Sequence, residues 1–224
     1  MHTASILFVL SLVTSGLAAQ KFVSTTGNNS NSGSQTSPWR TVTFAAATAT
    51  SGTVINIAAG TYGTTGFLEG IEVKSGKILT FKGAGRGKTI IKANSGFSKT
   101  IPYFGTTRRW TAVFIIHGKD TVVRVLDMTV DADHLSASRL TTIIYSDGAS
   151  GTVDSCELAN AGAAPLNGVS GQLGFMAVGK DSSNPSTVKL THCEVRGFNK
   201  IGVMMFGNGL NGIVEHCTIR GAGM

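Results

Sequence analysis

Two Lys-Asp pairs stand out as side chains that could do chemistry, Lys119-Asp120 and Lys180-Asp181, and each directly follows a glycine at the end of an apolar segment. A lysine can act as a general base where nearby cations lower its pKa, and aspartate oxygens are ligands that Ca²⁺ prefers. The sequence Gly-Lys-Asp is equally typical of a solvated turn. Both interpretations stay open at this point, a reactive edge and an ordinary turn.

Further polar residues end two apolar segments of the chain, namely His117, Tyr145 and Asp147. If each segment is a strand that alternates between two faces, with Phe114 and Ile144 inward, these three side chains point outward. Adjacent strands lie about 4.8 Å apart, so we expect His117 to lie beside Asp147. The outer face of these strands is then a groove floor.

Two other pairs of polar residues recur at equivalent positions. Glu157 and Glu194 should lie side by side on adjacent strands. A glycoside hydrolase needs two carboxylates across a cleft, so this pair is a candidate for that chemistry. Their apolar neighbours in the sequence, however, resemble a side wall and not a cleft. His192 and His216 should lie one above the other at a bend, where exposed turn histidines are favoured over a metal site because no third ligand reaches them.

The elements that must position these residues repeat along the chain. In four segments an apolar residue is followed three positions later by Met or Cys and two positions after that by an aliphatic residue: 125–130, 153–158, 190–195 and 214–219. The sulfur-bearing residues are 28, 37 and 24 positions apart, as in coils with fixed strands and variable loops. Such a unit cannot bury its inner face alone, so successive units must stack. The sequence predicts an all-β solenoid.

Cys156, Cys193 and Cys217 occupy one inward position of this repeat. A thiol at such a position behaves as a small apolar side chain. We predict a stack of reduced, buried cysteines, with a Cys193–Cys217 disulfide as the alternative.

Length and composition favour one domain. The chain has 224 residues, is 42% hydrophobic and contains 29 Gly and 4 Pro, which is typical of many short strands around a full core. Its main apolar run, residues 6–13, is too short to span a bilayer and precedes small residues. We predict a signal peptide at 1–19, secretion, no membrane span and one solenoid domain at 20–224.

The net charge of +7 is concentrated in one stretch. Ten Lys and Arg and no Asp or Glu lie between Lys74 and Lys119, whereas residues 120–224 sum to −3. A field of one sign attracts polyanions, and for an exported protein we expect an acidic polysaccharide and not nucleic acid; solubilising surface lysines are the alternative. The run Arg108-Arg109-Trp110 adds an aromatic ring that could stack on a sugar.

The opening of the chain carries a set of motifs in a fixed order. Residues 41–49 place Val42, Ala45, Ala46 and Ala49 on one face of a short capping helix. Around it lie Phe22-Val-Ser-Thr-Thr-Gly-Asn28, Ser37-Pro-Trp-Arg-Thr41, a strand and turn at 52–62, and Gly83-Ala-Gly-Arg-Gly-Lys-Thr-Ile-Ile91. This order resembles the N-terminal cap and first coils of secreted right-handed parallel β-helix proteins of the pectate-lyase-like superfamily.

The resemblance implies a right-handed parallel β-helix with a substrate groove along one sheet. It also implies a polysaccharide lyase that cleaves a uronic-acid polymer by β-elimination. Catalytic candidates are then Lys180 or Lys119 as base, with His117 beside them. Calcium would bind Asp120, Asp147 and Asp181. The residues expected to bind substrate are Tyr145, Arg108, Arg109, Trp110, Arg196 and Arg220.

Other functions stay open beside the lyase. A non-catalytic carbohydrate-binding or cell-surface protein would use the basic end as its contact surface. A glycoside hydrolase on the same fold is a further alternative. No C-terminal cap is evident after residue 219, so we expect an oligomer, or more chain, to cover the last coil.

Overall fold

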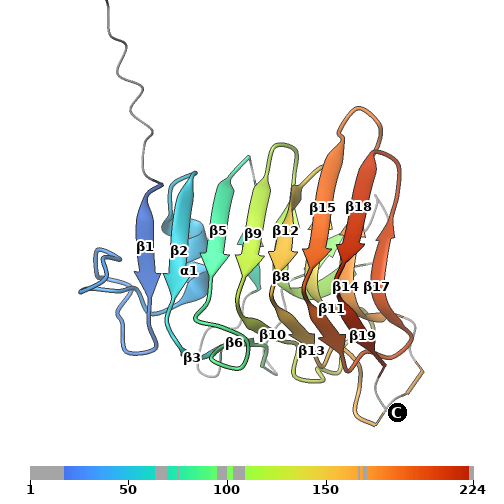
Figure 1. Cartoon of the computed structure of the whole chain (residues 1–224), viewed down its shortest axis with the longest axis horizontal. Coiled ribbons are helices and arrows are strands. Elements are labelled where there is room, and N and C mark those ends of the chain that lie inside the picture. Colours follow the sequence, from blue (N-terminus) through green and yellow to red (C-terminus); the bar gives the residue numbers. More distant parts are fainter. Residues whose placement is uncertain are drawn as a thin grey trace, which may run out of the picture.

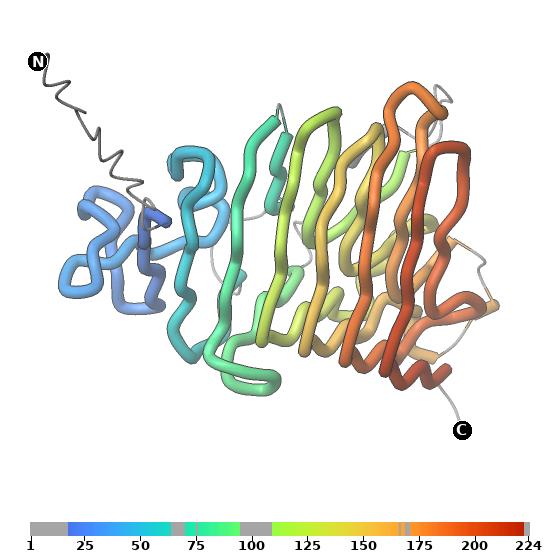
Figure 2. Tube along the Cα trace, turned by 45° about the horizontal axis from the view of Figure 1, so that its top comes forward, coloured from blue at the N-terminus to red at the C-terminus, as the bar shows by residue number. Residues whose placement is uncertain are grey.

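The computed structural model describes residues 18–63, 70–74, 76–94, 100–102, 109–165, 167–168 and 171–221. The chain winds in successive coils along one axis, and equivalent strands of each coil lie side by side (Figures 1 and 2). Strands of neighbouring coils pair in parallel to form three sheets. The predicted right-handed parallel β-helix is confirmed.

Each sheet contains one strand from most coils. Sheet A comprises β1 (Gln20–Val23), β2 (Thr53–Ile57), β5 (Ile78–Lys82), β9 (Val122–Leu126), β12 (Ser150–Asp154), β15 (Ser186–Thr191) and β18 (Leu210–Glu215). Sheet B comprises β3 (Gly60–Tyr62), β6 (Thr89–Lys92), β10 (Thr129–Asp131), β13 (Glu157–Ala159), β16 (Glu194–Arg196) and β19 (Thr218–Arg220). Sheet C comprises β4 (Ile71–Val73), β8 (Arg109–His117), β11 (Leu140–Ser146), β14 (Gln172–Val178) and β17 (Ile201–Phe206), with β7 (Thr100–Pro102) antiparallel to β8.

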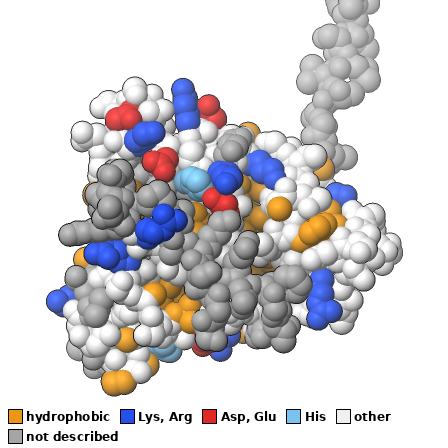
Figure 3. All heavy atoms as spheres, turned by 180° about the vertical axis from the view of Figure 1, so that it is seen from behind, with side chains coloured by type: hydrophobic (Ala, Val, Ile, Leu, Met, Phe, Trp, Pro, Cys, Tyr) orange, Lys and Arg blue, Asp and Glu red, His pale blue; other side chains and the backbone are white. Residues whose placement is uncertain are grey.

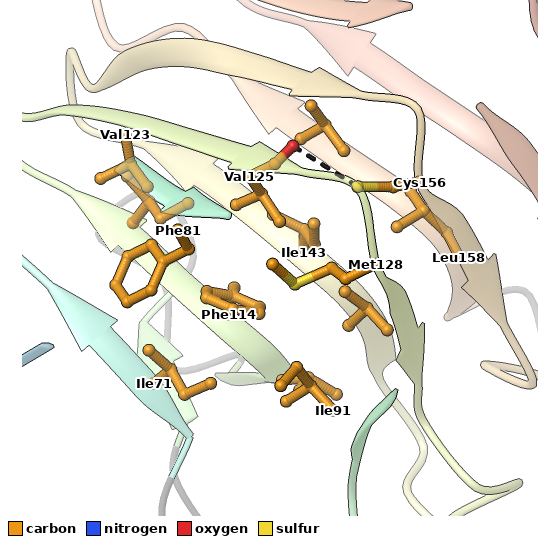
Figure 4. Close-up of a cluster of buried hydrophobic side chains, with 14 of the residues drawn as sticks. Ile71, Phe81, Ile91, Phe114, Val123, Val125, Met128, Ile143, Cys156 and Leu158 are labelled. Carbon is orange, nitrogen blue, oxygen red and sulfur yellow. Dashed lines mark hydrogen bonds between the residues drawn. The ribbon is translucent and has the colours of Figure 1, made fainter. Parts of the chain in front are cut away.

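The predicted ladder forms the interior of the tube. Val125, Val153, Leu190 and Val214 pair in consecutive coils of sheet A. Figure 4 shows part of this interior, where Met128 and Cys156 lie among aliphatic and aromatic side chains. All three cysteines are free thiols, as predicted, and Cys156 and Cys193 are buried, whereas Cys217 in the last coil is only partly buried. Burial raises the pKa of Cys156. Cys156 and Cys193 therefore serve as apolar filling.

A single residue turns the chain from sheet A to sheet B in each of the later coils. Asp127, Ser155, His192 and His216 all adopt positive φ, between 50° and 57°. The backbone N–H groups of Asp127, Ser155 and His192 bond to the next coil, for example Ser155 N to Thr191 O at 3.1 Å. This regular corner keeps the ladder in register while the loops elsewhere vary in length.

The predicted helix is α1 (Val42–Thr48), and it packs against β4 at the N-terminal edge of sheet C. Thr41 Oγ1 caps it by accepting from Phe44 N at 3.2 Å. At its other end the Lys77 ammonium donates to the carbonyl oxygens of Ala46 and Ala47. The helix thus covers an edge strand that would otherwise present unpaired backbone groups.

One register prediction is wrong. Phe114 pairs with Ile143, and His117 pairs with Ser146, so Asp147 does not lie beside His117. The prediction aligns Gly118 with Gly148. The turn between β11 and β12, residues 147–149, is one residue shorter than the turn between β8 and β9, residues 118–121. Aligning the glycines therefore shifts the predicted pairing of β8 with β11 by one residue.

The same shift places Tyr145 inside the tube and not on the groove floor. Its side chain is 0% exposed, and its hydroxyl donates to Val123 O at 2.8 Å. Burial raises the pKa of Tyr145, so the phenol remains a hydrogen-bond donor. Tyr145 cannot contact a substrate on the outer face.

The outer face of sheet C is apolar but not open. Ile115, Ile144 and Met176 form a cluster separate from the core, and each is at most 1% exposed. Trp110 belongs to the same cluster and is 6% exposed. The prediction of a groove floor along this face is therefore wrong, and Trp110 does not present a free ring for a sugar.

The C-terminal coil is the least buried. Val214 and Ile219 are 43% and 46% exposed, whereas their partners one coil earlier, Leu190 and Val195, are fully buried. Among the described residues, no helix has the length and hydropathy to span a lipid bilayer. The predicted signal peptide lies almost entirely outside the described residues and stays a prediction.

Candidate functional site

The turns that connect sheet C to sheet A gather most of the predicted catalytic residues. His117 ends β8, Lys119 and Asp120 follow it, and Lys180 and Asp181 follow β14 two coils later. Asp147 lies in the turn between them. Turns of neighbouring coils are in contact here, because a Cβ on Gly148 would lie 3.3 Å from Asn184 Cβ and 3.5 Å from Lys119 Cα. We call these turns the C–A edge.

A carboxylate that the sequence analysis did not identify meets His117 at this edge. Glu72 extends from β4, which pairs with β8, and its Oε1 lies 2.8 Å from His117 Nε2. Its Oε2 lies 3.4 Å from Lys74 Nζ. The side chains of His117 and Glu72 are 24% and 17% exposed, so the pair is shielded but reachable.

This arrangement suits proton transfer. A carboxylate bonded to one ring nitrogen orients an imidazole and stabilises its protonated form, which leaves the other nitrogen to exchange a proton with a ligand. Within the described part of the chain, His117 Nδ1 has no hydrogen-bond partner. His117 is thus the predicted catalytic residue that the structure equips best.

The two predicted lysines have a different environment. Lys119 and Lys180 are both exposed, and neither pairs with an acid in the described residues. As exposed ammonium groups they suit binding of a substrate carboxylate. Figure 3 shows the side of the molecule opposite to sheet A, where side chains of both charges and a histidine gather over part of the surface.

The predicted calcium ligands do not form a shared site. Among the described residues, no three His, Cys, Asp or Glu side chains lie close enough to hold a metal ion. The Asp181 carboxylate instead accepts hydrogen bonds from Ser183 and Asn184, and these bonds lower its pKa. Asp120 and Asp147 both have positive φ, as turn residues do. The donor set therefore does not fit calcium.

The remaining predicted binding residues lie elsewhere. Arg108 lies outside the described residues, and Arg109 is exposed at the start of β8. Arg196 and Arg220 pair on the outer face of sheet B, away from the C–A edge. Arg196 Nε donates to Glu157 Oε1 at 2.6 Å, so this guanidinium already has an internal partner.

The contacts of Glu157 also argue against the hydrolase alternative. Glu157 and Glu194 are neighbours, as predicted, but Glu157 accepts from Thr129 Oγ1 as well as from Arg196. Burial raises the pKa of Glu157, and these two hydrogen bonds more than reverse the effect and hold it below its usual value. Such a carboxyl is a poor general acid.

The two turn histidines stack as predicted. Their ring centroids lie 5.1 Å apart with an interplanar angle of 6°, and His192 Nδ1 lies 2.9 Å from Asp154 Oδ1. With no group of three ligands in the described residues, the structure gives no metal site here.

Glu72 was missed because its strand is only three residues long, and a strand that short shows no clear alternation in the sequence. One signal was available. Glu72 is the last acid before the base-rich stretch that begins at Lys74, and Ile71-Glu72-Val73 places it between two apolar residues. That pattern predicts an outward carboxylate on a short strand.

Solved structures similar to this chain share its fold at low sequence identity. A rhamnogalacturonan lyase matches with 12% identity and a TM-score of 0.44, over 92% of this chain and 63% of its own. This chain thus spans less than two thirds of that enzyme. A pectin methylesterase in complex with a hexasaccharide matches with 13% identity and a TM-score of 0.50, over 93% of this chain and 68% of its own.

A second structure of a pectin methylesterase with a hexasaccharide matches with 12% identity and a TM-score of 0.47, over 93% of this chain and 68% of its own. No curated protein matches the sequence. One family model does, with the description "Protein of unknown function (DUF1565)", over residues 25–162. Because that match covers more than half of the chain, the protein belongs to the DUF1565 family.

Proposed function

We propose that the protein binds an acidic polysaccharide along the C–A edge and cleaves it by β-elimination. The observation that carries this proposal is the 2.8 Å contact between His117 Nε2 and Glu72 Oε1, on an edge that also presents Lys119 and Lys180. An oriented base and nearby ammonium groups are what elimination from a uronate requires.

Each group has a defined role in the proposed reaction. His117 takes the proton from the carbon next to the uronate carboxyl, and Glu72 stabilises the imidazolium that forms. The electron pair of that C–H bond forms the new double bond, while the bond to the glycosidic oxygen breaks and its electrons leave with the oxygen. Water supplies a proton to this oxygen. His117 later returns its proton to solvent.

The lysines act on the substrate carboxylate. The ammonium group of Lys119 or Lys180 pairs with it and spreads the charge that develops as the proton leaves. This assignment differs from the sequence-based expectation of a lysine base, because both side chains are exposed while His117 has an orienting partner. No step is assigned to calcium, since the aspartates do not form a site for it.

The ligand class is supported by charge. Ten Lys and Arg and no acid lie between Lys74 and Lys119 in the sequence. The structural similarity to a pectin methylesterase bound to a hexasaccharide motivates polygalacturonate as the first polymer to test. We also propose that the protein is secreted, since such polymers are extracellular.

Turnover by the wild-type chain tests the proposal. Polygalacturonate, alginate and a glycosaminoglycan are each incubated with the protein, with and without EDTA, and the ultraviolet absorbance of an unsaturated uronide is followed. We expect the absorbance to rise with one uronate polymer and to be unaffected by EDTA. No rise with any of the three would contradict the proposed elimination.

Binding without turnover is the second candidate. It is favoured by the closed outer face of sheet C, where Ile115 and Met176 are fully buried and leave no open floor beside His117. In that case a polymer is retained on the exposed lysines, and retention falls with salt. Retention of polygalacturonate with no unsaturated product identifies this function.

A further inference from the structure

A hollow lies at the N-terminal end of the β-helix, and its lining residues are remote in the sequence from His117. It has a volume of about 540 Å³, within the range of small-molecule sites. One wall is the outer face of the first strands of sheet A, and the other is the polar loop 24–38. We call it the N-terminal groove, lined among others by Phe22, Ser24, Thr26, Gln35, Asn56 and Lys82.

Three of these side chains form one row across the sheet. Phe22 pairs with Asn56, and Asn56 pairs with Lys82, so an aromatic ring, an amide and an ammonium group follow one another on three adjacent strands. Strand spacing separates neighbouring positions by about 4.8 Å. The row therefore offers an apolar contact at one end and a positive charge at the other.

The groove is positively charged. Lys82 is exposed and has no acidic partner within the described residues, and no Asp or Glu lines the groove. The next residue of the row beyond Lys82 is Leu126, so the nearest acid in the row, Asp154, lies two strands away. A ligand that fits this charge carries an anionic group at the Lys82 end.

The polar wall is rigid before any ligand binds. Trp39 Nε1 donates to Asn31 O at 2.8 Å, and Asn31 Nδ2 donates to Pro38 O at 2.9 Å. Gly33, with φ of 74°, packs so closely under the Trp39 ring that a Cβ would lie 2.6 Å from a ring carbon. A preformed wall spares the ligand the entropic cost of ordering the loop.

The remaining groups suit hydroxylated ligands. The hydroxyls of Ser24 and Thr26 lie 3.0 Å apart at the wall. Asn56 Nδ2 donates to Gln20 Oε1 at 2.5 Å. This hydrogen bond fixes the orientation of the Asn56 amide and leaves its Oδ1 available as an acceptor. Closely set hydroxyl and amide groups beside an aromatic ring match a sugar, which has an apolar face and polar edges.

We propose that the N-terminal groove binds a carboxylated sugar unit, with its carboxylate on Lys82 and one face of its ring on Phe22. The proposal takes its ligand class from the proposed function and adds a site outside the C–A edge. A long acidic polysaccharide could then be held at two points along the rod, which raises its effective affinity.

Lysine protection tests this proposal on the intact protein. The chain is treated with an amine-acylating reagent, with and without trigalacturonate, and the acylation of each lysine is measured by mass spectrometry. We expect trigalacturonate to protect Lys82 and to leave Lys189 unprotected, since Lys189 is exposed on the same face of sheet A but outside the groove. Equal acylation of Lys82 with and without the sugar contradicts the proposal.

Matched variants give an independent measurement by calorimetric titration with trigalacturonate. Lys82→Gln is expected to weaken binding at the groove about tenfold, as for loss of a charged hydrogen bond, and Lys189→Gln to leave it within about twofold. Unchanged affinity in Lys82→Gln overturns the proposal. The acylation experiment distinguishes this proposal from the proposed function. Protection of Lys119 by trigalacturonate shows binding at the C–A edge, whereas protection of Lys82 shows binding in the N-terminal groove.

Discussion

At the scale of single residues, the role of a side chain depends on what it contacts and not only on its type. His117 and His216 are both histidines next to a turn, yet His117 has a carboxylate at 2.8 Å whereas His216 stacks on another imidazole at the surface. Arg196 and Lys180 are both cations, yet the first is paired with Glu157 and the second is exposed. Function is therefore assigned to His117 and the exposed lysines.

Glu72 and Lys119 should affect the kinetic constants differently. Glu72→Gln removes the charge that stabilises the imidazolium, so we expect kcat on the cleaved polymer to fall by at least about tenfold with little change in KM. Lys119→Gln removes a group that pairs with the substrate carboxylate both before and during proton removal, so we expect it to raise KM as well as lower kcat. Steady-state kinetics of the two variants measure this split. A rise in KM alone for Glu72→Gln would show that Glu72 has no role in proton transfer.

The stability contributed by Glu157 should depend on pH. Its pKa is lowered in the folded chain by Thr129 and Arg196, so the stabilisation is present above the unfolded pKa of about 4.3 and is lost as the pH falls through the folded value. Thermal melts of Glu157→Gln should therefore fall below wild type at pH 7 and converge with it in acid.

The adjacent Glu194 provides the control for that experiment. It occupies the equivalent position of the next coil but has no hydrogen-bond partner for its side chain in the described residues. Glu194→Gln should leave the Tm nearly unchanged across the same pH range. An equal loss at pH 7 in both variants would mean that the contacts of Glu157 contribute nothing specific.

At the scale of elements, the sequence was most informative where packing repeats. The valine ladder and the cysteine stack were predictable, because an inward position must be apolar in every coil and the corner residue fixes the spacing. The inward orientation of Tyr145 was not predictable, because the turn after β11 is one residue shorter than the turn after β8. That difference places every side chain of β11 on the face opposite to the expected one. Glu72 was hidden by the shortness of β4.

Equivalent valines in different coils should differ in their contribution to stability. Val153 is fully buried, whereas Val214, its counterpart two coils later, is 43% exposed. We expect Val153→Ala to lower the free energy of unfolding by about 2 kcal/mol and Val214→Ala by less than about 1 kcal/mol. Denaturant unfolding measures both. Equal losses would show that the last coil is covered in solution.

At the scale of the whole molecule, the β-helix separates charge along its length. Residues up to Lys119 include 12 of the 19 Lys and Arg, whereas residues 120–224 include 10 of the 12 Asp and Glu. Retention on immobilised polygalacturonate should therefore decrease steeply with salt, because exposed charges are screened within about 8 Å at physiological ionic strength. Elution at a salt-independent position would argue against an electrostatic contact.

The two ends of the β-helix differ in how well they are covered. α1 covers the first edge of sheet C, while the last coil leaves Val214 and Ile219 partly exposed. The sequence predicts that an oligomer, or more chain, covers this coil. Sedimentation of the wild-type chain and of a Val214→Lys, Ile219→Lys variant would show a change in mass if two copies meet there, and the same monomer mass for both if they do not.

The most direct test of the central claim is the rate of unsaturated uronide formation from polygalacturonate by His117→Gln, measured beside wild type and His216→Gln. His216 is exposed at the last corner and takes no part in the proposed reaction. The account predicts a loss of at least about a hundredfold for His117→Gln and wild-type activity for His216→Gln. Full activity of a folded His117→Gln chain would contradict the assignment of the base and of the C–A edge as the reactive site.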